Sequence, residues 1–191
     1  MKKAPKELSE MTLQELWELF PIALVPHDEK WKAQYREEER LLQTALADVK
    51  VARISYIGST AVEGIMSKNI VDILVEIRQE EDMPRAAERI VGCGYLEMSR
   101  DERRMSFNKG YTKYGYAKKV FHLHLRFEGD NYELYFRDRL IDRPELAKEY
   151  ERLKTDLAKK FEHDRDAYTD AKLQFVSAVT EEARGAYGDR Y

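Results

Sequence analysis

The chain of 191 residues has the length of one globular domain with a substantial core. Hydrophobic residues make up 43% of it and charged residues 36%, which excludes wholesale disorder. The net charge is −3, and the 33 basic and 36 acidic side chains are mixed along the sequence. Because no block is rich in Lys or Arg, we expect no broad binding of duplex nucleic acid, whereas a local basic pocket for phosphate is compatible with this charge.

The sequence also limits the compartment in which the protein is expected. Its single cysteine, Cys93, excludes an intrachain disulfide and a thiolate metal cluster. No apolar signal core follows the first five residues, and the longest apolar run, around 73–75, is too short to span a bilayer. We therefore expect a cytoplasmic protein that does not insert into membranes.

The N-terminal part is predicted to contain two helices and two strands. The capping-box pattern of Thr12 to Glu15 predicts a short helix that ends near residue 20. Apolar residues at helical spacing predict a longer helix over 28–47. The segments 51–57 and 70–77 have the pattern of strands, and the second is apolar on both faces, which is typical of a central strand.

The rest of the chain is predicted to complete the sheet and then to become helical. A helix over 82–91 is followed by three strands that we expect to be antiparallel neighbours, over 95–98, 105–109 and 119–127. After Asn131 the pattern is helical, with predicted helices over 133–141, 144–161 and 166–186. The expected fold class is α/β, with a helical C-terminal third.

The turn Gly58-Ser59-Thr60 directly follows the first predicted strand. Glycine lets the backbone turn sharply and brings amide groups close to a ligand, and the two hydroxyls could then meet a phosphate. A turn of this composition after a strand is structural more often than functional.

Asp72 and Glu76 are the two acids of the second strand. A buried unpaired carboxylate is costly, so Asp72 needs a metal, a cation or several donors. An ion pair with Lys68, Arg126 or Arg53 is the structural alternative. Glu76 lies about 13 Å further along the strand by strand rise, and we expect it to end the strand in solvent.

His122 and His124 are separated by one residue on a predicted strand. Side chains at such positions point to the same face, so both imidazoles are aimed into one space. With Asp72 as a third ligand they could hold one divalent metal, although two ordinary core histidines are an equally good interpretation. The candidate phosphate-binding cations are Lys68, Arg126, Arg137, Lys154 and Lys172. Taken singly, Arg137, Lys154 and Lys172 are each more typical of an ordinary solvated charge.

Taken together, these motifs resemble the signature of the GrpB family. The resemblance is carried by residues 57–65 and 67–75 and continues at 25–31, 122–124, 136–140 and 167–175, and at 144–147 with Tyr150, Leu153 and Lys154. It covers roughly residues 22–185. The chain departs from the family by having Glu63 and Asn69 where proline is usual.

The resemblance implies the nucleotidyltransferase fold over 22–191, a mixed sheet with flanking helices and a helical extension, with 1–21 as an N-terminal helical extension. In that superfamily a Gly-Ser turn holds nucleotide phosphates and acids on the next strand bind magnesium. Gly58 and Ser59 match the turn, and Asp72 matches the first acid. The position of the second acid holds Leu74, and a third acid would fall near His122 or His124.

Three functions fit these observations. The first is a transferase that uses Ser59, Asp72, His122 and His124 with Mg, Mn or Zn on a nucleotide or another phosphorylated small molecule. The second is an inactive module that binds a nucleotide or a coenzyme, since family members are fused to a coenzyme A biosynthetic kinase. The third is a hydrolase in which a metal-bound water is the nucleophile. Leu74 favours the second, and the paired histidines favour the other two.

Overall fold

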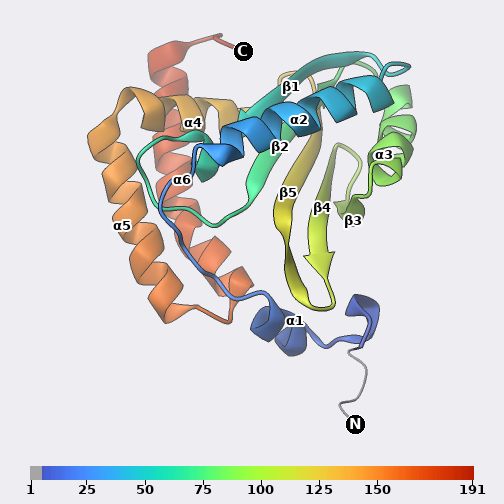
Figure 1. Cartoon of the computed structure of the whole chain (residues 1–191). Helices are drawn as coiled ribbons and strands as arrows, with labels where there is room; N and C mark the ends of the chain where they lie inside the picture. Colours follow the sequence, from blue (N-terminus) through green and yellow to red (C-terminus); the bar gives the residue numbers. More distant parts are fainter. Residues whose placement is uncertain (1–5) are drawn as a thin grey trace.

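The computed structural model describes residues 6–191. Its five strands form one mixed sheet in the order β1-β2-β5-β4-β3 (Figure 1). The pair β2 and β5 is parallel, and the other three neighbouring pairs are antiparallel. The strands are β1 (Val51–Ile57), β2 (Val71–Ile77), β3 (Leu96–Arg100), β4 (Arg104–Thr112) and β5 (Gly115–Phe127). The predicted strands and the antiparallel arrangement of the last three are confirmed.

Six α-helices and three short 3-10 helices occupy the rest of the described chain. The α-helices are α1 (Leu13–Leu19), α2 (Lys30–Ala45), α3 (Met83–Gly92), α4 (Tyr132–Asp142), α5 (Pro144–Lys160) and α6 (Arg165–Tyr187). The 3-10 helices are η1 (Leu8–Glu10), η2 (Ser59–Ala61) and η3 (Glu80–Asp82). The predicted capping box starts α1. None of the helices within residues 6–191 combines the length and the hydrophobicity that crossing a bilayer requires.

The main core lies on the face of the sheet that α2 and α3 cover. Alternate residues of β2, from Val71 to Ile77, point to this face and are fully buried. Trp31 and Leu42 of α2 and Ile90 of α3 pack against them, and α2 crosses this face in Figure 1. The intervening residues of β2, which include Asp72, therefore point to the opposite face.

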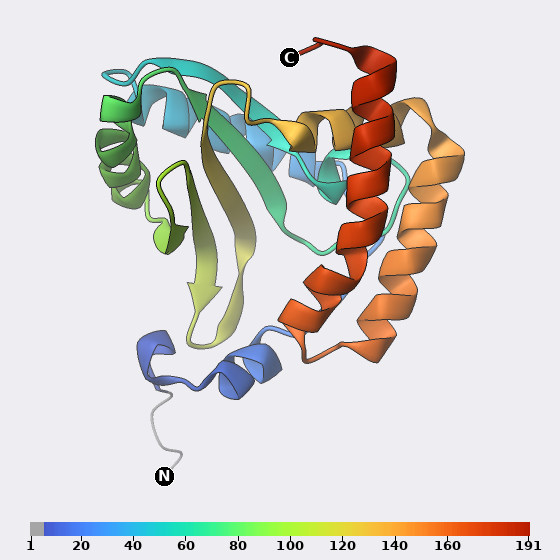
Figure 2. The same ribbon diagram turned by 180° about the vertical axis from the view of Figure 1, so that it is seen from behind.

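The C-terminal helices lie on that opposite side, where α5 and α6 run next to each other (Figures 1 and 2). Val62 and Ile65, from the segment after the Gly58 turn, are buried in a cluster with Tyr150 of α5 and Val179 of α6. This packing holds α5 and α6 against the segment that joins β1 to β2. The predicted fold class, a mixed sheet with flanking helices and a helical C-terminal extension, is confirmed.

The N-terminal segment lies next to the turn that joins β4 to β5 (Figure 2). The Phe20 ring packs on Tyr111 and Tyr116 of that hairpin, with centroid distances of 4.8 and 5.0 Å. The backbone N–H of Ile22 donates to the carbonyl oxygen of Glu162 at 2.9 Å, so the segment joins the hairpin to the α5–α6 turn. The division into an extension, 1–21, and a domain, 22–191, stays a prediction, and residues 1–5 of that extension lie outside the described residues.

Candidate functional site

The turn after β1 brings its backbone against the carboxylate of Asp72. Gly58 has φ +72°, in the left-handed region that favours glycine. A Cβ atom at Gly58 would lie 2.2 Å from Oδ2 of Asp72, which is closer than any real contact. Glycine is therefore required here both by its backbone conformation and by the approach of Asp72.

Asp72 is adjacent to His122 on the neighbouring parallel strand. The β2–β5 register pairs Asp72 with His122 and Leu74 with His124, so all four side chains lie on one face. Oδ1 of Asp72 is 3.5 Å from Nδ1 of His122, and both side chains are partly exposed, Asp72 by 25%. His122 Nε2 in turn lies 2.7 Å from the hydroxyl of Tyr111 on β4.

At neutral pH this pair consists of a carboxylate and a neutral imidazole. Burial lowers the pKa of His122, although the neighbouring Asp72 acts against this shift. Burial alone would raise the pKa of Asp72, but the contact with His122 and the charge of Lys68 outweigh it and keep the pKa below its ordinary value. Because His122 is neutral at pH 7, the effects that lower the pKa of Asp72 at that pH are the contact with the His122 ring and the charge of Lys68.

The predicted metal set of Asp72, His122 and His124 is incomplete in its geometry. Within residues 6–191 no three His, Cys, Asp or Glu side chains are arranged to hold a metal ion. Arg126 donates to Nδ1 of His124 from Nη2 at 3.3 Å, so this ring nitrogen already has a partner in the protein. Burial lowers the pKa of His124 to about 4, so its ring is neutral. Binding of a metal stays a prediction.

Three lysines, Lys68, Lys154 and Lys172, lie near enough to Asp72 for its charge to act on all of them, and we call them the lysine cluster. They come from the segment before β2, from α5 and from α6. The ammonium groups of Lys68 and Lys172 lie 5.5 and 4.2 Å from the centroid of the buried Tyr168 ring. In the part of the chain that the structure describes, neither group forms an ion pair or a hydrogen bond. Two cations therefore share one aromatic ring without a bound acid.

Each lysine of the cluster has a strongly lowered pKa. Burial lowers the pKa of Lys68 to about 7, and the positive charges of Lys172 and Arg165 contribute to the shift. Burial likewise lowers the pKa of Lys154 to about 7 and that of Lys172 to about 8. The charge of Asp72 acts in the opposite direction on all three. The single carboxylate of Asp72 is thus not enough to restore the ordinary pKa of these lysines.

Lys154 differs from the other two lysines because its ammonium group has partners in the protein. It is only 2% exposed and donates to the carbonyl oxygen of Met66 at 2.5 Å and to Oγ of Ser67 at 3.4 Å. The interpretation of Lys154 as an ordinary solvated charge is therefore wrong. Its bonds fix the segment that leads to Lys68.

Both predicted phosphate-binding arginines already have partners elsewhere. Arg126 is buried and donates from Nη1 to the carbonyl oxygens of Met105 and Leu125, both at 3.1 Å. Arg137 donates from Nη1 to the carbonyl oxygen of Tyr56 at 2.7 Å and from Nε to Asp138 at 2.8 Å. Both guanidinium groups hold backbone or neighbouring acids in place, and neither belongs to the lysine cluster.

The two hydroxyl side chains of the turn also differ from each other. Thr60 is 1% exposed and its hydroxyl donates to the carbonyl oxygen of Ile70 at 3.2 Å. That bond fixes the end of the segment before β2, so the hydroxyl of Thr60 is occupied. Ser59 is partly exposed at the first position of η2 and remains the hydroxyl that a ligand could reach.

Sequence reasoning missed two residues at this site, Tyr111 and Arg165. Nη2 of Arg165, the first residue of α6, donates to the hydroxyl of Tyr111 at 2.9 Å, and the charge of Arg165 acts on Lys68 and Lys172. Neither residue stands in a motif, because they are brought together by the packing of α6 against the hairpin. No pattern along the chain could have found them.

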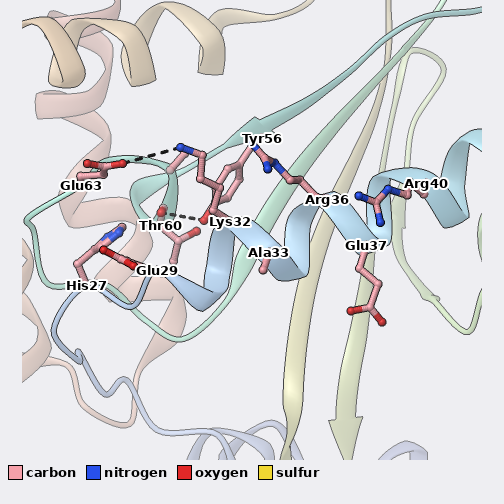
Figure 3. Close-up of a pocket in the computed structure, with 11 residues that line it drawn as sticks. His27, Glu29, Lys32, Ala33, Arg36, Glu37, Arg40, Tyr56, Thr60 and Glu63 are labelled. Carbon is pink, nitrogen blue, oxygen red and sulfur yellow. Dashed lines mark hydrogen bonds and ion pairs between the residues drawn. The ribbon is translucent and has the colours of Figure 1, made fainter.

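A separate groove of about 800 Å³ lies on the other side of the turn, between α2 and η2 (Figure 3). It carries three basic side chains, Lys32, Arg36 and Arg40, and three acidic ones, Glu29, Glu37 and Glu63. Lys32 lies 4.0 Å from Glu63, as the dashed line in Figure 3 marks. Because its charges balance, this groove is less suited to an anion than the lysine cluster is.

Comparison with known proteins identifies the family. The model of the GrpB protein family matches residues 21–182. The chain belongs to the GrpB family. The glutamate-rich protein GrpB of Alkalihalophilus pseudofirmus is 37% identical to it over 167 residues, which cover 84% of this chain and 95% of that protein.

Further comparisons give a solved structure of similar fold, a longer protein that this chain matches in part, and one weak structural match. The conserved protein GrpB from Enterococcus faecalis has a crystal structure that matches with a TM-score of 0.75 at 24% identity, over 86% of this chain and 99% of that one. A dephospho-CoA kinase of Mycolicibacterium paratuberculosis is 24% identical over 178 residues, which cover 80% of this GrpB chain and 43% of the kinase. The Cid1 poly(U) polymerase matches only at a TM-score of 0.49 and 12% identity, which says nothing about activity.

Proposed function

We propose that this GrpB protein binds a nucleotide or another phosphorylated small molecule at the lysine cluster, beside Ser59 and Asp72. The observation that carries the proposal is the pair of ammonium groups of Lys68 and Lys172. They share the Tyr168 ring and have no acidic partner within the described residues. Uncompensated cations in a half-buried place are costly to the fold, so they are better explained by a ligand than by stability.

A phosphate group would supply the negative charge and the hydrogen-bond acceptors that the lysine cluster lacks. Phosphate oxygens accept charge-assisted hydrogen bonds, which are stronger than neutral ones. Lysine serves as a compact point charge with three donors, so several lysines can adapt to one phosphate chain. An anion near Lys68 and Lys172 would also raise the lowered pKa values of these side chains back toward their ordinary range. Ligand binding would then increase the positive charge of the cluster, most of all at Lys68, whose pKa without ligand is about 7.

Group transfer from the bound ligand is the activity that the resemblance to nucleotidyltransferases implies. Asp72 stays ionised at neutral pH and contacts a neutral His122, so the pair could accept a proton from an attacking hydroxyl. The lysine cluster would stabilise charge that develops on the phosphate oxygens. Since the donors for a metal do not fit as a complete set, no step of this proposal depends on one.

A second candidate is a module that binds coenzyme A or its precursor without transforming it. The specific observation in its favour is the match to part of a dephospho-CoA kinase. These coenzymes carry a nucleotide with several phosphates, which the same lysine cluster could bind. The two candidates therefore differ in turnover and in the preferred ligand, and they share the site.

Thermal unfolding in the presence of a ligand panel tests both candidates. The panel contains pyrophosphate, the four nucleoside triphosphates, coenzyme A and dephospho-CoA, each with and without Mg²⁺, Mn²⁺ or Zn²⁺. A ligand at one hundred times its dissociation constant adds about 2.7 kcal/mol to stability. Stabilisation by a triphosphate that is then consumed supports transfer, and stabilisation by a coenzyme without turnover supports the module. If no phosphate compound in the panel stabilises the protein, the proposal is wrong.

A matched pair of variants shows whether the ligand occupies the lysine cluster. Lys172→Met keeps most of the side-chain volume and removes the charge, and we expect it to weaken phosphate binding at least tenfold. Lys159→Met makes the same change at a side chain that is 75% exposed on α5, and it should bind like the wild type. Equal affinities for both variants would place the ligand elsewhere.

A further inference from the structure

We infer that Tyr111 and Arg165 are positioning residues of the Asp72 site, because they complete a chain of polar contacts from Arg165 through Tyr111 and His122 to Asp72. Its four members come from α6, β4, β5 and β2, respectively. The separations are 2.9 Å from Arg165 to Tyr111, 2.7 Å from Tyr111 to His122 and 3.5 Å from His122 to Asp72.

The chemistry of the four groups determines which group donates and which accepts in each of these contacts. A guanidinium can only donate, so Nη2 of Arg165 donates to the hydroxyl oxygen of Tyr111. A carboxylate can only accept, so we assign to Nδ1 of His122 the proton that faces Asp72. In a neutral imidazole Nε2 then has a free lone pair, and this lone pair accepts the hydroxyl proton of Tyr111. Every donor in the chain is matched by an acceptor.

Packing holds the middle of this chain in place. The Tyr111 ring lies nearly parallel to the His122 ring, with 17° between the planes and 5.9 Å between the centroids. Phe20 packs on Tyr111 at 4.8 Å, and the Arg165 guanidinium lies 5.5 Å from the centroid of the Tyr111 ring. Tyr111 therefore has ring contacts with α6, β5 and the N-terminal segment, which restrict its hydroxyl to one place.

The consequence is a fixed carboxylate at the ligand site. The imidazole presents its Nδ1–H to Oδ1 of Asp72, while Oδ2 lies against Gly58. The 3.5 Å contact is longer than an ordinary hydrogen bond, and such contacts often shorten when a ligand binds. This role of Tyr111 and Arg165 rests on the proposed function, because it gives His122 and Asp72 a task. The contact chain itself, however, exists without a ligand.

Nitrogen-15 NMR of the histidine rings tests the chain in ligand-free protein. The sequence has only four histidines, so few signals need assignment, and His122→Asn identifies the one of interest. We expect the wild-type His122 ring to be neutral at pH 7, with the proton on Nδ1 and a free lone pair on Nε2. A proton on Nε2 at pH 7 would overturn the inference without any further variant.

Two substitutions of tyrosine by phenylalanine complete the test. Tyr111→Phe removes the donor to Nε2, so the Nε2 signal should shift to that of a nitrogen without a hydrogen bond, and the ring should sample both tautomers. Tyr114→Phe makes the same change in the same hairpin at a side chain that is 76% exposed, and it should leave the His122 signals unchanged. Unchanged signals in folded Tyr111→Phe would also overturn the inference.

The result separates this inference from the proposed function. If wild-type protein has the expected tautomer but pyrophosphate does not bind, the proposed ligand is wrong and the contact chain stands. If pyrophosphate binds but the His122 signals are the same in Tyr111→Phe as in wild type, the contact chain is wrong and the proposed ligand stands.

Discussion

Asp72 and Glu76 lie on the same face of the same strand, and their surroundings are opposites. Glu76 is fully buried and has a partner at each oxygen: Nε of Arg53 at 2.7 Å from one, and Nδ2 of Asn131 at 3.0 Å and the Gly129 N–H at 3.1 Å from the other. Asp72 is 25% exposed, its contact with His122 is 3.5 Å long, and among residues 6–191 no lysine or arginine forms an ion pair with it. A satisfied buried acid supports the fold, whereas an under-satisfied acid among unpaired lysines is typical of a ligand site.

The comparison also corrects an expectation from the sequence. Glu76 was expected to end its strand in solvent, and this is wrong, because β5 and the turn after it cover that end of β2. Arg53, predicted as an alternative partner of Asp72, pairs with Glu76. The ion pair that would have made Asp72 structural is therefore formed by Glu76, four residues further along β2, and it leaves Asp72 without Arg53 as a partner.

The largest expected effect is on stability, at Glu76. Glu76→Gln removes the charge opposite Arg53, whose side chain is 32% exposed, and weakens the bonds from Gly129 and Asn131. We expect a loss of about 3 kcal/mol in the free energy of unfolding, measured by urea titration. Asp72→Asn should change the same quantity by less than about 1 kcal/mol. Equal losses at the two positions would remove the distinction between them.

The next effect concerns the approach of the Gly58 turn to Asp72. Gly58→Ala adds a methyl group that collides with Oδ2 of Asp72 and occupies a left-handed backbone conformation, so we expect a loss of about 2 kcal/mol. Gly64→Ala is the matched control, because Gly64 has φ +77° and open space around its Cβ position. It should lose only about 1 kcal/mol from the backbone strain. Equal losses of stability in Gly58→Ala and Gly64→Ala would mean that the contact between residue 58 and Asp72 does not contribute to the effect.

The lysine cluster predicts that the ligand-free protein becomes more stable as the pH rises from 7 to 9.5. The pKa of Lys172 is lowered from 10.5 to about 8, so the unfolded chain binds more protons than the folded one between these values. The stability penalty is complete below pH 8 and is relieved as the pH rises. Lys172→Met should remove about 1 kcal/mol of this increase, whereas Lys159→Met should follow the wild-type curve. Parallel curves for all three proteins would contradict the lowered pKa.

The smallest effect separates the lysine cluster from a metal as the source of phosphate affinity. Without divalent cations Asp72→Asn removes a negative charge near the phosphate, so we expect pyrophosphate to bind about two- to fivefold more tightly. Calorimetric titration measures this difference. Weaker binding of Asp72→Asn in Mg²⁺, Mn²⁺ or Zn²⁺, with wild-type affinity increased by the same ion, would instead support the predicted metal at Asp72.

Much of the fold could be predicted from the sequence, because most helices and strands are determined by the pattern of residues within them. The periodic apolar residues of 28–47 and 70–77 and the capping box at Thr12 predict their elements directly. What could not be predicted depends on distant partners. Arg126 and Arg137 have the charge that phosphate needs, but only the packed structure reveals their carbonyl acceptors.

The central claim is that the Asp72 end of this face binds phosphate while the Glu76 end supports the fold. Urea unfolding of wild type, Glu76→Gln and Lys172→Met, with and without saturating pyrophosphate, tests it most directly. We predict that pyrophosphate stabilises wild type and Glu76→Gln by the same amount, about 2.7 kcal/mol at one hundred times the dissociation constant, although Glu76→Gln starts from a lower stability. Lys172→Met, with a dissociation constant at least tenfold higher, should gain no more than about 1.4 kcal/mol at the same pyrophosphate concentration. Equal stabilisation of Lys172→Met and wild type, or none of any protein, would contradict the claim.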